Sequence, residues 1–214
     1  MAGIRYSNDG FTLLELLITM ALSGLVMTGI YSVYSSQQIT YNSQMQTVEM
    51  QQNLRAGMFM LVNEIRMAGY DPTGDTNAGI VKLESDSITF TMDLNGDGTL
   101  DDSGEKITYL LYTASDGKKK LGRKNPTRSQ AVAENFDALD FVYLDAGGNV
   151  TSSTSAVRSV QISIVSKTDR VAVSNFLNNT TYYNLQGDSI FTAVGDTFRR
   201  IQLATQIKCR NLGL

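Results

Sequence analysis

A short segment between Asp93 and Glu105 carries oxygen-bearing side chains at nearly every second position, with glycines between them. Calcium prefers a cage of such oxygens on a tightly turning loop, so the segment predicts a calcium site. The carboxylates would repel one another without a nearby cation, which favours this interpretation. The side chains expected to take part are Asp93, Asn95, Asp97, Thr99, Asp101, Asp102 and Glu105.

The same segment is similar to an EF-hand loop at its first, third, fifth and sixth positions, with Leu100 at the expected apolar position. The similarity ends where the closing acid of an EF-hand would fall on Gly104. Either Asp101, Asp102 or a shifted Glu105 completes the shell, or no tight site forms. The alternative is a hairpin turn built on the Asn-Gly and Asp-Gly pairs, with acids kept there for solubility. The sequence leaves both interpretations open.

A basic segment follows, comprising Lys118, Lys119, Lys120, Arg123 and Lys124. It either forms a solvated turn after Asp116-Gly117 or contacts a polyanion. No aromatic side chains alternate with the lysines to stack on bases, so the sequence argues against nucleic acid as a partner. We expect the solvated turn.

The composition argues against an enzyme. The chain has no histidine, which excludes Ser-His-Asp and Cys-His arrangements and the usual histidine-bearing zinc sites. It contains no phosphate-binding loop or dinucleotide fingerprint, and its net charge is only −3. Its single cysteine, Cys209, is expected to be a small apolar core residue. We therefore predict a protein that requires no cofactor, with calcium as the one candidate ion.

One acid, Glu15, lies inside an apolar stretch from Phe11 to Tyr34 that is long enough to cross a bilayer as a helix. A charge in such a segment needs a partner. Farther along, apolar residues recur at steps of four and three, which indicates one stripe of a helix: Leu54, Met58, Leu61, Ile65 and Ala68. We expect a single helix over residues 11–68 that ends at Gly69.

Past Pro72 the pattern changes to short runs typical of strands, and alternation such as Ile88, Phe90 and Met92 predicts one buried face. The expected strands are 80–84, 87–92, 106–113, 118–123, 139–144, 157–165 and 201–208. The predicted fold class is α+β, with a long N-terminal transmembrane and amphipathic helix packed on one antiparallel sheet. We expect four parts: residues 1–10, the two halves of the helix at 11–34 and 35–69, and a head at 70–214.

The run Gly10-Phe11-Thr12-Leu13-Leu14-Glu15, followed by apolar residues, resembles the processing site of type IV prepilins and of the pseudopilins of type II secretion. The resemblance implies that prepilin peptidase cuts between Gly10 and Phe11 and that the new amino terminus of Phe11 is methylated. Residues 1–10 would then be a leader. It also implies that Glu15 pairs with the amino terminus of a neighbouring subunit, which would neutralise a costly charge.

The order of the later elements, closing with Cys209-Arg210-Asn211-Leu212, resembles the larger minor pilins of the PilW type and their GspJ-type counterparts in secretion. This implies a pilin-like minor subunit that helps to initiate or cap a type IV pilus. The alternatives are a minor pseudopilin, or a pilin at the tip that binds a ligand as an adhesin or DNA receptor. The implied partners are prepilin peptidase, other minor pilins, the major pilin, the inner-membrane assembly platform and the lipid bilayer. The implied location is the bacterial inner membrane with the head in the periplasm, and later a filament tip or a periplasmic pseudopilus.

Overall fold

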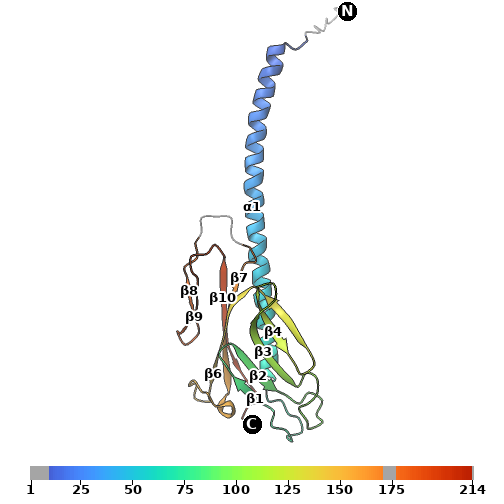
Figure 1. Cartoon of the computed structure of the whole chain (residues 1–214), viewed down its shortest axis with the longest axis vertical. Coiled ribbons are helices and arrows are strands. Elements are labelled where there is room, and N and C mark those ends of the chain that lie inside the picture. The colour runs from blue at the N-terminus through green and yellow to red at the C-terminus, as the bar shows by residue number, and fades with distance from the viewer. Residues whose placement is uncertain (1–9, 171–176, 214) are drawn as a thin grey trace, which may run out of the picture. The chain divides into compact units, whose positions relative to one another are not determined.

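The computed structural model describes residues 10–170 and 177–213 (Figure 1). These residues form one long helix, α1 (Leu13–Arg66), a short 3-10 helix, η1 (Thr154–Ala156), and ten strands. The chain divides into two compact units, residues 1–44 and 45–214. The predicted leader lies outside the described residues, apart from Gly10.

The first unit contains the apolar part of α1. Every residue from 13 to 34 is exposed, including Leu13 and Leu25, whose exposed fractions are 80% and 73%. Within the described residues, α1 is the one helix long and apolar enough to cross a membrane. Such side chains need an apolar surrounding, which lipid or neighbouring helices can supply.

The strands of the second unit form three antiparallel sheets (Figure 1). The first sheet has its strands in chain order: β1 (Ile80–Leu83), β2 (Ser87–Thr91), β3 (Lys106–Thr113), β4 (Lys119–Lys124) and β5 (Ser129–Glu134). The second sheet has the order β10 (Arg200–Lys208), β7 (Ser159–Lys167), β6 (Phe136–Leu144). The third is a hairpin of β8 (Thr181–Tyr183) and β9 (Ser189–Thr192).

The predicted α+β class, with a long helix and antiparallel strands, is confirmed, but the strands form three sheets and not one. The seven predicted strands are present with ends shifted by at most three residues. Only Asn135 separates β5 from β6, and its φ of +65° lies in the left-handed region that asparagine adopts more readily than most residues. The chain turns there, so β6 leaves the first sheet and pairs with β7 instead. The sequence analysis also missed β5, β8 and β9.

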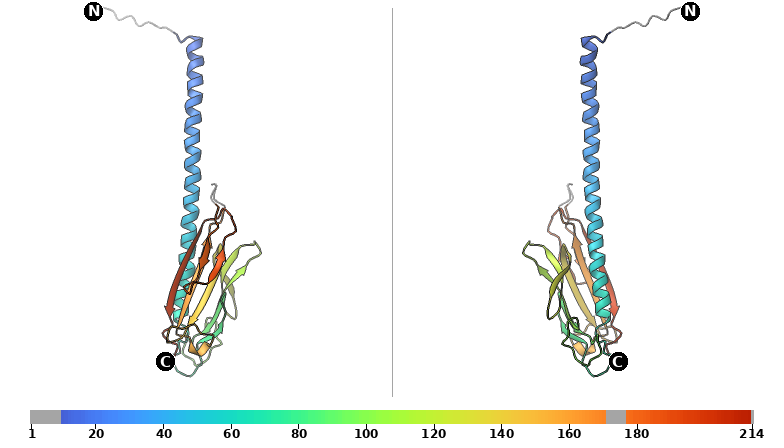
Figure 2. Two further views of the ribbon diagram at one scale, coloured as in Figure 1. Left: turned by 90° about the vertical axis from the view of Figure 1, so that its left-hand side faces the viewer. Right: turned by 90° about the vertical axis from the view of Figure 1, so that its right-hand side faces the viewer.

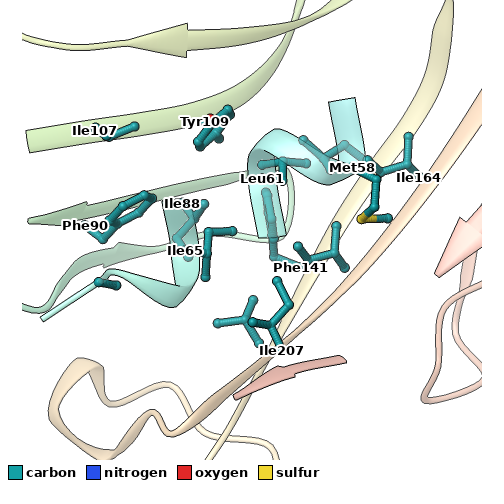
Figure 3. Packing of buried hydrophobic residues seen from close by; sticks show 14 of the residues in the cluster. Met58, Leu61, Ile65, Ile88, Phe90, Ile107, Tyr109, Phe141, Ile164 and Ile207 are labelled. Atoms are coloured by element: carbon teal, nitrogen blue, oxygen red, sulfur yellow. The ribbon is translucent and has the colours of Figure 1, made fainter. Parts of the chain in front are cut away.

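The core of the second unit lies between the C-terminal turns of α1 and the two larger sheets. The predicted helical stripe is confirmed, because all five of its residues are buried: Leu54, Met58, Leu61, Ile65 and Ala68. In Figure 3, Leu61 and Ile65 lie among side chains of the first sheet, such as Ile88, and of the second, such as Phe141. Figure 2 shows these last helical turns alongside the strands that they cover.

The end of α1 is closed by the C-terminal residues of the described chain. The helix stops at Arg66, and Gly69 has a φ of +79° while its N–H donates to the carbonyl of Thr91. A side chain at Gly69 would clash, because its Cβ would lie 2.6 Å from a methyl carbon of Leu212. Cys209 is buried, as predicted, and is not in a disulfide. Packing and backbone hydrogen bonds therefore hold this end of the chain.

Candidate functional site

The start of α1 is a reciprocal cap made by Thr12 and Glu15. The Thr12 hydroxyl accepts a hydrogen bond from the Glu15 N–H at 3.2 Å, and Glu15 Oε2 accepts from the Thr12 N–H and hydroxyl, each at 2.9 Å. This is a capping box, in which two backbone donors of the first turn are satisfied at once. The Thr-x-x-Glu spacing is its sequence signal, and the sequence analysis did not use it.

Glu15 is the only Asp, Glu, Lys or Arg between Gly10 and Glu49. No Lys or Arg of the described chain forms an ion pair with it, and its hydrogen bonds go to Thr12. The neighbouring residues Leu13, Leu14 and Leu16 are exposed apolar side chains. The arrangement therefore places one carboxylate, held by a cap, at the beginning of an uncovered apolar helix.

The acidic loop between β2 and β3 is organised by two buried carboxylates. Asp93 is fully buried and accepts hydrogen bonds from the N–H groups of Gly96 and Gly98, at 2.7 and 3.1 Å. Glu105 is 1% exposed and accepts from the N–H groups of Leu94 and Asp102, each at 3.1 Å. These bonds hold the two ends of the loop together and fix its turns.

The other predicted calcium ligands lie on the outside of this loop. Asn95 donates to the carboxylates of Asp97 and Asp102, and the Thr99 hydroxyl donates to Asp97 and Asp101. In residues 10–170 and 177–213, no three or more His, Cys, Asp or Glu side chains come together in a group that could hold a metal ion. The loop does have an internal hydrogen-bond network, which the hairpin interpretation also expects. Calcium binding here stays a prediction.

The basic segment is largely occupied by contacts within the chain. Lys118 pairs with Asp169, and Lys120 pairs with Asp116 and Glu134 at 2.9 and 3.2 Å. The Lys119 ammonium donates to the carbonyl of Asp137, and Arg123 pairs with Glu64 of α1 at 2.8 Å; Lys124 is exposed. These contacts neutralise most of the positive charge of the basic segment. Contact with a polyanion stays a prediction.

Arg123 belongs to a connection between α1 and the first sheet. Its Nε donates to both oxygens of Glu64, at 3.0 and 2.8 Å, and the hydroxyl of the fully buried Tyr109 donates to the same carboxylate at 2.8 Å. Burial, with a further contribution from Glu64, raises the pKa of Tyr109 far above its ordinary value, so the phenol stays protonated and keeps donating. The sequence analysis counted Arg123 as a surface cation and did not find this pairing.

A second network, also missed, surrounds Arg200 at the start of β10. Its side chain is 2% exposed, and its Nε lies 2.6 Å from Asp137 Oδ2 while its Nη2 lies 2.5 Å from Asp196 Oδ2. Lys167 of β7 pairs with the other oxygen of Asp137 at 2.8 Å. The rings of Phe191 and Phe198 lie near the guanidinium. The network joins β6, β7 and β10 to the segment that follows β9.

Known proteins resemble the chain in two separate stretches of its sequence. A model of the prokaryotic N-terminal methylation motif matches residues 5–31, which include Gly10, Phe11 and Glu15. A family model described as prepilin peptidase-dependent protein B matches residues 43–173. Among solved structures, a type IV-like pilin from Thermus thermophilus is similar, with a TM-score of 0.49 and 13% identity, covering 76% of this chain and 97% of that one. Comparison with curated protein sequences found no match.

Proposed function

The chain belongs to the prepilin peptidase-dependent protein B family, and from this premise we propose that it is a minor pilin that helps to initiate or cap a type IV pilus. Its membership and its methylation motif make it a pilin-like protein that is processed by prepilin peptidase. We place the cut between Gly10 and Phe11. We further propose that α1 anchors the precursor in the inner membrane with its head in the periplasm, and that the processed chain then joins the filament.

The observation that carries this proposal is the environment of Glu15. A charged side chain within a membrane-spanning helix is costly unless a partner neutralises it. Glu15 has no cation within the described chain, and its hydrogen bonds are to Thr12. A free amino terminus on a neighbouring subunit would supply the missing positive charge. The pair would then favour one register of packing between adjacent helices.

The proposed function is assembly rather than catalysis. The exposed apolar residues 13–34 would pack against the helices of other pilins once the subunit leaves the bilayer. The proposed partners are therefore prepilin peptidase, other minor pilins, the major pilin and the assembly platform. A minor pseudopilin of type II secretion would use the same leader and helix, so the two roles must be separated by experiment.

The test compares Glu15→Ala with Glu49→Ala, which removes the same charge from an exposed position farther along the same helix. We expect Glu15→Ala to lower incorporation into purified filaments, because the variant lacks the carboxylate that would pair with the amino terminus of a neighbouring subunit. Membrane insertion and leader removal, measured by carbonate extraction and mass spectrometry, should be unchanged. Glu49→Ala should incorporate normally.

Normal incorporation of Glu15→Ala would contradict the pairing role, and a mature chain that keeps its first ten residues in cells with active peptidase would contradict the processing site.

A deletion strain separates the candidate roles. Loss of surface filaments supports a pilus subunit, whereas normal filaments with failed protein export assign the chain to a secretion system. Normal filaments that no longer adhere or take up DNA would assign it to ligand binding.

A further inference from the structure

A groove of about 610 Å³ lies in the second unit, away from α1. Four segments form it: the β1–β2 turn, residues 139–143 of β6, residues 150–152 after β6, and the β8–β9 hairpin. The hairpin is fixed in place by side chains, because Gln186 donates to Gln161 of β7 at 2.9 Å and Gln202 of β10 donates to the carbonyl of Tyr183. In Figure 1 the hairpin lies beside β10. The groove is therefore part of the folded head.

Two carboxylates, Asp140 of β6 and Asp188 next to β9, meet at the side chain of Asn184. The Asn184 amide donates to Asp140 Oδ2 at 3.1 Å and to Asp188 Oδ2 at 3.3 Å. Its own carbonyl oxygen accepts from the N–H groups of Gln186 and Asp188, which fixes the orientation of the amide. Asn184 thus holds two acids from different segments at one place in the groove.

These acids lack a cationic partner. No Lys or Arg of the described chain pairs with Asp140 or Asp188, and the nearby Lys82 is held by Glu84 at 2.5 Å. Burial raises the pKa of Asp140 and the charge of Asp188 raises it further, against the hydrogen bond from Asn184. Asp140 is half-buried and Asp188 is exposed, and the groove carries negative charge there that a cation would stabilise.

Part of the groove wall is apolar. Leu83, Val142, Val150 and Ile190 line it together with the two acids, and Val150 is 63% exposed. Lysine and arginine bury their methylene stems along such surfaces while the charged group reaches a polar partner. A bare metal ion would gain nothing from these walls, and the described residues include no group of three or more acids that could enclose one.

We propose that this groove binds a lysine or arginine side chain presented by a partner polypeptide, with the stem against Leu83 and Ile190 and the charge between Asp140 and Asp188. The carboxylates accept hydrogen bonds from the ammonium or guanidinium, and the apolar walls exclude water from the stem. This assigns a recognition surface to the head that does not depend on Glu15 or on the apolar half of α1.

The test uses the full chain in nonionic detergent with its isoleucine methyl groups labelled for NMR. The probes are the blocked tripeptides Gly-Lys-Gly and Gly-Arg-Gly, with Gly-norleucine-Gly as the neutral analogue of the lysine peptide. We expect the two basic peptides to shift the Ile190 methyl saturably and to leave the buried Ile65 methyl unchanged. The norleucine peptide should produce no saturable shift.

Variants separate the groove from charge in general. Asp140→Asn combined with Asp188→Asn should weaken binding of the basic peptides at least tenfold. Asp145→Asn is the matched control, because Asp145 is partly buried, as Asp140 is, and its side chain bonds only within its own turn. An unchanged Ile65 signal in each variant shows that the head is folded, so weaker binding cannot be attributed to unfolding.

Equal binding of the norleucine peptide would overturn the proposal, as would equal binding by the Asn variants. The absence of a saturable shift below about 20 mM probe would overturn it too. A shift of Ile190 by calcium chloride that excludes the lysine peptide would assign the groove to a metal ion instead. The assay does not involve filament assembly. Its failure would therefore leave the proposed function in place, and failure of the Glu15 test would leave the groove in place.

Discussion

Replacing Arg200 by leucine tests whether the buried ionic network holds the second sheet together. Arg200→Leu keeps a similar apolar stem next to Phe191 and Phe198 but removes hydrogen bonds to Asp137 and Asp196. Breaking one side of a buried ion pair costs about 3–5 kcal/mol, because the remaining charge is left without compensation.

The structure places the expected value at the low end of that range. Asp137 is 7% exposed, but it keeps Lys167 at 2.8 Å, and Asp196 is 29% exposed and can be hydrated. We therefore expect Arg200→Leu to lower the free energy of unfolding by about 3 kcal/mol, which is about 6–12 °C in Tm for a domain of this size.

Urea and thermal unfolding of the full chain in detergent, followed by tyrosine near-ultraviolet circular dichroism, would measure the loss. Arg199→Leu is the matched control, because the side chain of Arg199 is exposed next to Arg200. It should change stability by less than about 0.5 kcal/mol, as exposed substitutions usually do. If Arg200→Leu and Arg199→Leu unfold alike, the assignment of stabilising energy to this network is refuted.

The same network predicts a pH dependence. The hydrogen bonds from Arg200 lower the pKa of Asp196 below its ordinary value. A carboxyl whose pKa is lowered on folding contributes its stabilisation above its unfolded pKa, about 3.9, and loses it as the pH falls through the folded value. The stability difference between the native chain and Arg200→Leu should therefore be constant above about pH 5 and shrink below pH 4. A difference independent of pH would contradict this linkage.

Three further predictions follow from the described contacts. Gly69→Ala should destabilise by about 2–3 kcal/mol through its positive φ and its clash with Leu212, and Gly74→Ala, with a similar φ of +74° but open space, should lose only about 1 kcal/mol in the same urea titration. Millimolar calcium should raise the Tm of the chain and a chelator should reverse the effect if the loop from Asp93 to Glu105 binds it; superimposable melting curves would remove the hypothesis. Because burial raises the pKa of Cys209 to about 11, its thiol should react with a disulfide reagent only after denaturation, and rapid labelling of the native chain would contradict its placement.

The helix and most strands could be predicted because their signals are local. The spacing from Leu54 to Ala68 places the stripe on one helical face, and the alternation in β2 correctly marks Ile88 and Phe90 as buried. The single buried face that it predicted is wrong, because Thr89 and the other polar residues of β2 are buried as well. Glu15 could be singled out because it interrupts an apolar run and falls at a fixed offset from Gly10 and Phe11. Both kinds of signal depend on neighbouring residues in the chain.

The features that were missed depend on pairing between distant segments. Arg200 and Asp137 are 63 positions apart in the sequence, and Glu64 and Arg123 are 59 apart. No pattern among neighbouring residues indicates that either pair forms. The division into two sheets depends on one left-handed residue, Asn135, which no periodicity marks. The interpretation of the basic segment depends on such distant partners as well. Its side chains form ion pairs with Asp169 and Glu64, which the sequence does not reveal.

The closure of Gly69 by Leu212 has a consequence for the order of folding. Asn211 donates to the carbonyl of Arg66, a contact that spans 145 positions. A ribosome makes the helix first and the residues that cover its end much later, and contacts of such separation form slowly because a long loop must close. Until then the apolar core lacks Leu212, which packs against it, so the nascent head exposes apolar surface to chaperones and to other nascent chains.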